Sequence, residues 1–406
     1  MKKYWKSIAI IVVIIFSLGA FYVNAASSVV IHPAFVIETL SGDANEIKPL
    51  QLVGHYSDTS SMNYVSTSVT LDEEGSTYQN RSFLNNLIGH PPGLISEYRD
   101  NYRNFMRGKN FDINSYFEND KHLAYADVEY NLSSIKSRDF KFNLAVLTKA
   151  DGNIDSFQLE VPNGNKFDYM YVEDVQLIEN KLFIITHSYK YQGDNYVNEK
   201  HNYTIDVTTH KMENDDIIIQ GTTDGAKTRT DTQLVSSNPI GASEHLIFIE
   251  TEWEIIEDME SSREEVIKQE FISYNILTKE KETIDLPNLQ LDENNLSFFD
   301  GSTIYFMTFG NQELIVTPYH LEDDKAGDSY SIPLSGEDGM AYAHMTTVKN
   351  DKLYITSSQM TNDIEADVIV ADATTGETLF TGKIAFKDPA EFTNPFELYF
   401  YSMYVK

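Results

Sequence analysis

The chain has 406 residues and no cysteine, and its 62 acidic residues against 31 basic ones give a formal net charge of −31. Without cysteine, thiol catalysis, haem attachment through paired cysteines, zinc fingers, disulfides and a lipoprotein anchor are excluded. The acidic balance argues against nucleic acid as a partner, and against adsorption of the bulk surface to anionic lipid or cell-wall polymer. A surface kept soluble by excess carboxylate explains this charge without any ligand.

The N-terminal segment predicts export from the cytosol. Lys2, Lys3 and Lys6 precede an uncharged, mostly apolar stretch over 8–23, and a cleavage site is expected after Ala25. The apolar stretch enters the bilayer while the lysines stay on the cytoplasmic side. Residues 1–25 are then either a cleaved signal peptide or, with residues 8–26 retained, a membrane anchor, because this stretch approaches the length of a membrane span. In both cases the rest of the chain lies outside, with at most one N-terminal span.

The next part of the chain predicts three strands and then a helix. The strands are expected at 29–40, 52–56 and 64–71, and the helical insertion at 84–110. Gly108 stands where this helix would stop. The residues that fall on one helical face are Leu94, Ile95, Tyr98, Tyr102, Phe105 and Met106.

After residue 110, short apolar runs rich in β-branched and aromatic residues alternate with polar turns, which is typical of β-strands. The residues that begin the most regular runs are Leu123, Leu182, Leu246, Ile304 and Leu353. They recur at a drifting period of roughly 50 to 60 residues with about four strands in each repeat, which predicts propeller blades with loop insertions.

We therefore predict an all-β fold: a β-propeller of six or seven blades with an N-terminal helical insertion, formed by residues 26–406 as a single domain. The stretch over 396–405 is expected to complete a blade with N-terminal strands, because closing the ring removes sheet edges. A pair of β-sandwiches, in which the periodicity is accidental, is the alternative.

One hairpin carries a family resemblance. Its turn, Asp372-Ala373-Thr374-Thr375-Gly376-Glu377, resembles the outer-strand hairpin of bacterial exported β-propellers with quinoprotein-like or WD-like repeats. The resemblance covers the repeated region and implies a propeller fold. The chain departs from the quinoprotein pattern, since it has two tryptophans in all and no vicinal cysteine pair. The cofactor chemistry of that family is therefore assigned to no residue, and no cofactor is predicted from it.

Arginines on the predicted helix are the candidate partner-binding site. Arg99, Arg103 and Arg107 recur every four residues, which places them in one stripe on a helix. Arginine pairs bidentately with carboxylates and phosphates, so the stripe predicts an anionic partner, either an envelope protein or a polymer. Two alternatives remain: the stripe contacts the chain's own acidic segment at 250–270, or it is a solvated helix face.

A calcium site is the candidate metal centre. Asp151, Asn153 and Asp155 alternate in the manner that opens a calcium-binding loop. Ser156 stands where such a loop needs glycine, and Pro162 where it needs a bidentate glutamate, so a hydrated hairpin turn explains the segment more simply. The ten histidines include no pair at zinc-ligand spacing on a helix.

No catalytic residue is identified by a motif, because neither a Gly-x-Ser-x-Gly elbow nor a phosphate-binding glycine loop is present. We therefore predict an extracytoplasmic, non-enzymatic binding, sensing or assembly module at the cell surface. The alternative is an exported hydrolase that acts on a polysaccharide or similar polymer through two carboxylates about 5–10 Å apart, with tyrosines and phenylalanines along its groove. A structural envelope component without a small ligand is a third hypothesis.

Overall fold

The computed structural model describes residues 32–60, 66–78, 93–133, 136–192, 195–224, 228–237, 242–257, 262–284, 295–310, 312–334, 344–388 and 394–406. The predicted signal segment lies outside these residues. Within them, no helix has the length and apolar character that crossing a membrane requires.

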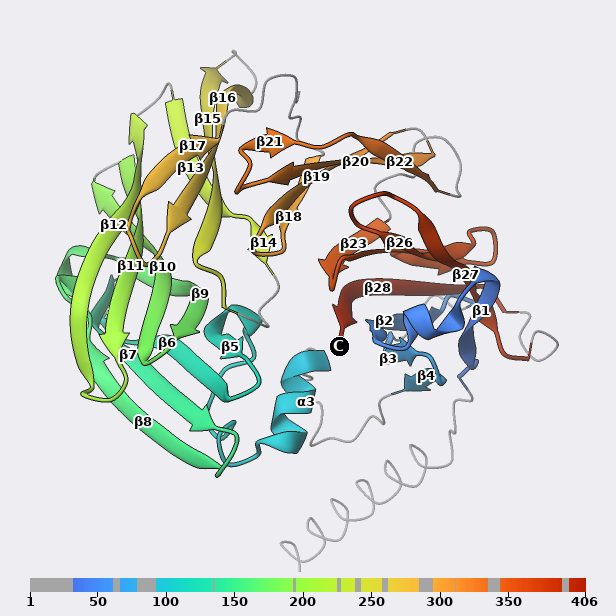
Figure 1. The fold of residues 1–406 in the computed structure, drawn as a ribbon, viewed down its shortest axis with the longest axis horizontal. Helices are drawn as coiled ribbons and strands as arrows, with labels where there is room; N and C mark the ends of the chain where they lie inside the picture. The colour runs from blue at the N-terminus through green and yellow to red at the C-terminus, as the bar shows by residue number, and fades with distance from the viewer. Residues whose placement is uncertain are drawn as a thin grey trace, which may run out of the picture.

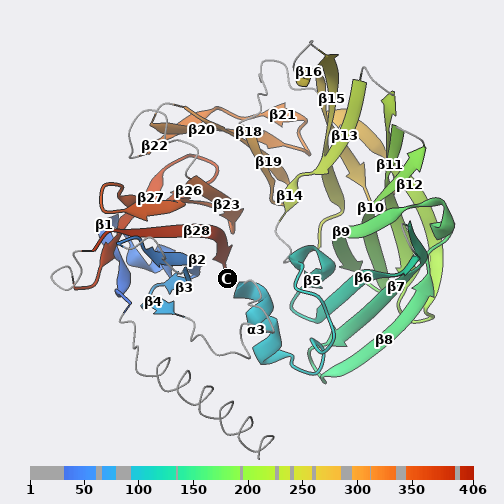
Figure 2. The same cartoon turned by 180° about the vertical axis from the view of Figure 1, so that it is seen from behind.

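The described chain forms mostly antiparallel sheets that stand around a common centre (Figure 1). The described residues form five hydrogen-bonded sheets, and the eight-stranded one consists of two units joined by a short pairing at Thr223–Arg229 and Asp224–Thr228. Counted separately, these units make a ring of six blades, which Figure 2 shows from behind. The predicted all-β propeller is therefore confirmed, and the alternative pair of sandwiches is wrong.

The first three blades consist mostly of strands from the N-terminal half of the chain, and two strands of blade one come from its C-terminal part. Blade one contains β2 (Leu50–Asp58), β3 (Thr67–Asp72), β4 (Gly75–Tyr78), β25 (Gln359–Thr361) and β28 (Phe396–Val405). Blade two contains β5 (Tyr116–Glu118), β6 (His122–Ser133), β7 (Lys136–Thr148) and β8 (Asn153–Glu160). Blade three contains β9 (Tyr169–Ile178), β10 (Lys181–Gln192), β11 (Asn195–Asp206) and β12 (Lys211–Asp224).

The other three blades complete the ring. Blade four contains β13 (Thr228–Leu234), β15 (His245–Glu257), β16 (Ser262–Asn275) and β17 (Lys281–Ile284). Blade five contains β14 (Ser236–Ser237), β18 (Asn295–Phe299), β19 (Thr303–Phe309), β20 (Glu313–His320), β21 (Lys325–Ala326) and β22 (Tyr330–Pro333). Blade six contains β23 (His344–Lys349), β24 (Lys352–Ser357), β26 (Ala366–Asp372), β27 (Thr378–Phe386) and β1 (Phe35–Gly42).

The repeat predicted from the sequence corresponds to one strand in each of five blades, blades two to six. The five apolar residues that set the repeat are the second residues of β6, β10, β15, β19 and β24, and each is at most 1% exposed. Each of these strands is the second strand of its blade in chain order when the short β14 before β18 and the closing strand β1 of blade six are left out. The repeat in the sequence therefore corresponds to the repeat of blades around the ring.

Both ends of the chain pair across the closure of the ring. As predicted, β28 joins β2, with Leu50 opposite Val405. The sequence did not indicate that β1 pairs with β27, with Phe35 opposite Phe386. In consequence, each of the two blades that meet at the closure contains strands from both ends of the chain, and Figure 1 places the C-terminus near the centre of the ring.

Within the described residues, the predicted helical insertion ends earlier than expected. The helix α3 extends over Gly93–Asn101, and turns continue it to Gly108, which has a positive φ of 76°. Ile95 and Tyr98 of α3 and Phe105 of these turns pack together against blade two, and the pattern had placed them on one face. Residues 84–92 lie outside the described residues. The described part of the chain also contains the short 3-10 helices η1 (Ala44–Ile47), η2 (Ile113–Ser115) and η3 (Gly164–Lys166).

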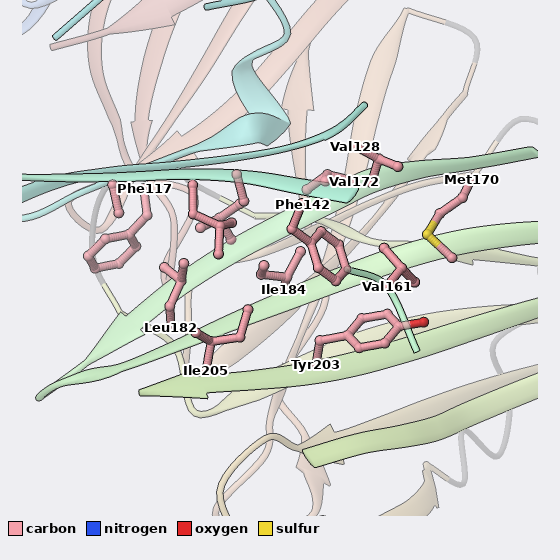
Figure 3. Close-up of a cluster of buried hydrophobic side chains, with 14 of the residues drawn as sticks. Phe117, Val128, Phe142, Val161, Met170, Val172, Leu182, Ile184, Tyr203 and Ile205 are labelled. Atoms are coloured by element: carbon pink, nitrogen blue, oxygen red, sulfur yellow. The ribbon is translucent and has the colours of Figure 1, made fainter. Parts of the chain in front are cut away.

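A large apolar core joins blade two to blade three (Figure 3). It contains side chains from β5 to β8 on one side and from β9 to β11 on the other, including Phe142 and Tyr203, whose ring centroids are 4.9 Å apart at 65°. Edge-to-face rings and close packing make this interface rigid. The same two blades carry the candidate site.

Candidate functional site

A buried polar cluster lies on the face of blade three that contacts blade four. His187 on β10 is opposite Lys200 on β11, and Tyr171 on β9 is opposite His187. Two other β11 residues on this face bond to blade four. Asn202 Nδ2 donates to Tyr274 OH at 3.1 Å, and Asn198 Nδ2 donates to the Thr230 carbonyl at 3.1 Å.

A β-bulge supplies the acidic member of this cluster. The pairing of β9 with β10 shifts between Ile185 and Thr186, so that Glu173 is the extra residue of β9. A bulge redirects a side chain locally. Glu173 follows Tyr171 by two residues and so shares the face of the cluster's lysine and histidine, and the bulge reverses the alternation of β9 only beyond it.

The three side chains are held by short polar contacts. Glu173 Oε1 accepts from Lys200 Nζ and lies 3.2 Å from His187 Nδ1, and Nδ1 is 2.9 Å from Lys200 Nζ. Lys200 is fully buried and His187 is 2% exposed. Burial by itself raises the pKa of Glu173, but the hydrogen bond from His187 and the positive charge of Lys200 outweigh it and hold this pKa below its usual range. We therefore treat Glu173 as ionised.

Two polar atoms of the cluster have no hydrogen-bond partner within the described residues. They are His187 Nε2 and Glu173 Oε2, and both are buried. Most buried polar atoms in native proteins are satisfied by protein or water, so such atoms identify positions where a water molecule or a ligand group would be stabilised.

A chain of aromatic rings leads from this cluster to the surface. The hydroxyls of Tyr171 and Tyr189 lie 3.0 and 3.3 Å from His187 Nδ1. The ring of Tyr169 is 5.8 Å from that of Tyr171 and 6.4 Å from that of Tyr189, and Tyr130 of β6 is 6.4 Å from Tyr169. Tyr130 and Tyr169 are 38% and 43% exposed. We call these four tyrosines the tyrosine surface.

A cavity of about 380 Å³ adjoins the tyrosine surface. Phe140 lines it and packs against Tyr130 with ring centroids 5.7 Å apart. Two lining residues, Asp139 and Asn163, have positive φ angles of 57° and 54°, a conformation that Asp and Asn tolerate better than other non-glycine residues. The remaining lining side chains are mostly polar: Asn131, Lys141, Glu160 and Asn165.

A second buried histidine lies on the opposite face of blade three, between two carboxylates. His201 Nδ1 lies 2.8 Å from Asp215 Oδ1, and its Nε2 lies 3.0 Å from Glu199 Oε2. Burial opposes the charged form, but the hydrogen bonds to these two carboxylates outweigh it and raise the pKa of His201. Its ring packs against Phe167, which directly follows η3 beside the cavity. This arrangement supports the wall of the cavity.

The structure places the predicted arginine stripe on α3 and the turns after it. Arg99 is half-buried, 5.5 Å from the centre of the Phe111 ring, whereas Arg103 and Arg107 are exposed. Within the described residues, no ion pair joins the stripe to the acidic segment at 250–270. That segment is paired instead with Arg229, 3.0 Å from Glu264, in blade four, far around the ring from α3 in Figure 1. An anionic partner for the stripe stays a prediction.

The candidate calcium ligands lie at the hairpin between β7 and β8. Asp151 Oδ1 accepts from the Asn153 amide at 3.0 Å, and Asp155 Oδ2 is 2.7 Å from His210 Nε2. In the part of the chain that the structure describes, no group of three or more His, Asp or Glu side chains converges to hold a metal ion. Calcium at this turn stays a prediction.

Sequence reasoning missed the cluster and the tyrosine surface. A signal was present, because Tyr169 and Tyr171, and likewise His187 and Tyr189, alternate with the period of a strand and so share one face. Their meeting depends on strand pairing, which places Lys200 opposite His187 although 13 residues separate them.

No protein-family model matches the chain, and no curated protein matches it. Among solved structures, it is similar to a Synechocystis apocarotenoid oxygenase variant (9% identity, TM-score 0.43), over 92% of this chain and 95% of that one. It is also similar to a chain of the nidogen/laminin complex (10%, TM-score 0.30, over 86% and 96%), and to Porphyromonas gingivalis dipeptidyl peptidase 4 (11%, TM-score 0.33, over 83% and 49%). At these values the likeness assigns neither a ligand nor an activity.

Proposed function

We propose that the protein is an extracytoplasmic, non-enzymatic binding module whose ligand lies on the tyrosine surface and in the adjoining cavity. One observation carries this proposal: a continuous series of rings runs from the exposed Tyr130 and Tyr169 to the buried His187. Ligand sites typically combine aromatic walls, a concave pocket and a few fixed polar groups, and these three features adjoin one another here. The export signal predicted from residues 1–25 supports the location outside the cytosol.

The anchoring of the tyrosines favours binding. Tyr171 and Tyr189 direct their hydroxyls to His187 Nδ1, which the buried pair of Lys200 and Glu173 holds in place. The ring of Tyr169 packs on both of these tyrosines and is restrained by them. A surface ordered before the ligand arrives loses less conformational entropy on binding, which increases affinity.

The hydrolase remains the second candidate, because Asp139 and Glu160 both line the cavity. Glu160 lies 3.7 Å from Lys141 and its side chain is 85% exposed. A general acid of a glycosidase usually occupies an apolar pocket instead. The environment of Glu160 therefore favours binding over hydrolysis.

The proposal also includes a family relationship for the chain and a second binding partner. A relationship to exported propellers with quinoprotein-like or WD-like repeats is supported by the β26–β27 hairpin, where Asp372 Oδ1 accepts from the amides of Thr374 and Thr375 and Gly376 has a φ of 74°. The exposed Arg103 and Arg107 supply a separate docking site for an anionic group of an envelope protein or polymer.

Saturation-transfer NMR on the mature protein tests the binding function. The probes are a mixed panel of neutral oligosaccharides, short peptides and nucleosides. We expect transfer to one class, abolished in Tyr169→Ala, with the probe spectrum unchanged after a day of incubation. Time-dependent cleavage of the probe would establish the hydrolase instead. Transfer that persists in Tyr169→Ala would place binding elsewhere and overturn the proposed site.

A further inference from the structure

We infer that the ligand of the tyrosine surface is a neutral glycan. This inference rests on the proposed binding function and adds the chemical class of the ligand. Three observations carry it: the angle between the exposed rings, the polar groups of the adjoining cavity, and the sign of the local charge.

The exposed rings form a corner that fits a sugar. Tyr130 and Tyr169 lie edge-to-face, with an interplanar angle of 76° and centroids 6.4 Å apart, so that the two exposed ring planes stand nearly at right angles. The face of an aromatic ring carries negative charge density. The C–H groups on one side of a pyranose are weakly positive, and they pack against such a face while the sugar hydroxyls point away from it to polar partners.

The cavity supplies partners that match hydroxyl groups. Asn131, Asn163 and Asn165 line it, and each amide side chain both donates and accepts hydrogen bonds, as a hydroxyl does. Its volume of about 380 Å³ is near the lower end of the usual range of small-molecule sites, about 300–1,000 Å³, which suits about one or two sugar rings.

The charges favour a neutral ligand. The charged lining residues are Asp139, Glu160 and Lys141, so carboxylates outnumber cations around the cavity. The whole chain carries a formal net charge of −31. Phosphate, sulfate or uronate groups would be repelled, whereas a glycan without charge would meet only hydrogen-bonding groups and rings. Nucleotides and acidic polymers are disfavoured at this site for the same reason.

The buried cluster acts on this site through the tyrosines. Tyr189 is a positioning residue, since its hydroxyl lies 3.3 Å from His187 Nδ1 and its ring packs on Tyr169. Removing only that hydroxyl keeps the ring but removes the contact with His187 that fixes its orientation. The variant Tyr189→Phe should therefore weaken glycan binding. The protein's preference for one glycan over another should not change.

Isothermal titration calorimetry with neutral oligosaccharides of glucose, N-acetylglucosamine, mannose and arabinose tests the inference. We expect at least one series to bind, with affinity reduced tenfold or more in Tyr169→Ala and in Tyr130→Ala, and severalfold in Tyr189→Phe. The matched control is Tyr399→Ala, which removes a tyrosine that is 47% exposed on β28 in blade one and should leave affinity unchanged. Circular dichroism melting of each variant verifies folding, and a sulfated form of the bound glycan should bind at least tenfold more weakly.

The outcomes separate this inference from the proposed function. If no neutral oligosaccharide binds but a peptide or nucleoside shows transfer that depends on Tyr169, the glycan is wrong and the binding function stands. If no probe of any class responds to Tyr169→Ala, both are wrong. An equal loss of glycan affinity in Tyr399→Ala, or equal binding of the sulfated glycan, would also overturn the assignment of a neutral glycan to this surface.

Discussion

Lys200 and Glu173 form an ion pair within the ring, between blades three and four, with side-chain exposures of 1% and 12%. The lysine pairs in regular register with β10, and the glutamate is the extra residue of a bulge in β9, on the same face of blade three. Its neighbours are His187 and the hydroxyls that fix the tyrosine surface. The pair thus couples the stability of the blade to the order of the site.

Removing the charge of Lys200 should destabilise the fold strongly. Lys200→Met leaves Glu173 buried without its partner, and losing one member of a buried pair costs about 3–5 kcal/mol. The double variant Lys200→Met/Glu173→Gln should recover much of this loss, because neither charge remains. Urea unfolding measures both. The single variant Glu173→Gln completes the comparison. If the double variant lost a free energy of unfolding equal to the sum of the losses in the two single variants, the two groups would not be coupled.

Asp174 should make the protein more stable in mild acid than at alkaline pH. Burial raises its pKa from 3.8 to about 6, opposed by the hydrogen bond from Gln176. Because the folded pKa lies above the unfolded one, the stability linked to its proton is fully present below pH 3.8 and is lost as pH rises through about 6. The whole change amounts to roughly 2–3 kcal/mol.

Asp174→Asn isolates this effect. The variant cannot ionise, so it should melt higher than the wild type at pH 8 and by a much smaller margin at pH 4.5. Melting curves at the two pH values supply the comparison, with Asp151→Asn at the exposed β7–β8 turn as the control. An equal difference at both pH values would contradict the role assigned to the Asp174 proton.

The arginine stripe should bind anions without contributing to stability. Arg103 and Arg107 are exposed, and exposed ion pairs contribute only about 0–1 kcal/mol. Arg103→Glu/Arg107→Glu should therefore melt within a degree or two of the wild type but elute from a phosphate-bearing resin at lower salt. The control is Arg263→Glu in blade four, where the native side chain is 69% exposed.

Adding Arg99→Glu tests the remaining residue of the stripe. Arg99 lies over Phe111, so its replacement should lower the melting temperature modestly through the lost cation–π contact. If the pair Arg103→Glu/Arg107→Glu lowered melting by several degrees, the stripe would be internal scaffolding. Unchanged elution in that pair would leave it as a solvated surface.

Export should be visible at the N-terminus of the native protein. We expect a mature chain that begins at Ala26, or an anchored chain whose C-terminus is accessible to protease from outside. N-terminal sequencing and protease protection distinguish these forms. Intact protein free in the cytosol would contradict both.

The sequence predicted the parts of the fold that depend on periodicity. Leu123, Leu182 and their equivalents mark one strand in each of blades two to six because these five blades bury the start of the equivalent strand in the same way. The closing strand β28 was also predicted, since an unpaired final strand would leave an exposed edge. The pairing of β1 with β27 was not, because an apolar strand does not reveal which of two neighbouring edges it will join.

The candidate site was harder to predict because it depends on pairing and not on pattern. Glu173, His187 and Lys200 lie on three different strands, and only the register between them, including one bulge, brings them together. A single inserted residue in β9 would redirect Glu173. The arginines, in contrast, were visible from local spacing alone, yet their helix ends at Asn101 and only turns carry the stripe onward.

The pairing at the closure of the ring has a consequence for the order of folding. β1 and β2 emerge first from a translocation channel, while their partners β27 and β28 emerge last. For a chain threaded N-terminus first across a membrane, as we propose, blades one and six therefore stay incomplete until the entire polypeptide has passed. Blades two to five are formed by the continuous stretch from β5 to β22, with β14 of blade five emerging before β15 of blade four, and they can form as this stretch appears. The last step of folding is then the pairing of β27 with β1 and of β28 with β2. Until this step occurs, the nascent protein exposes strand edges that are covered in the complete ring.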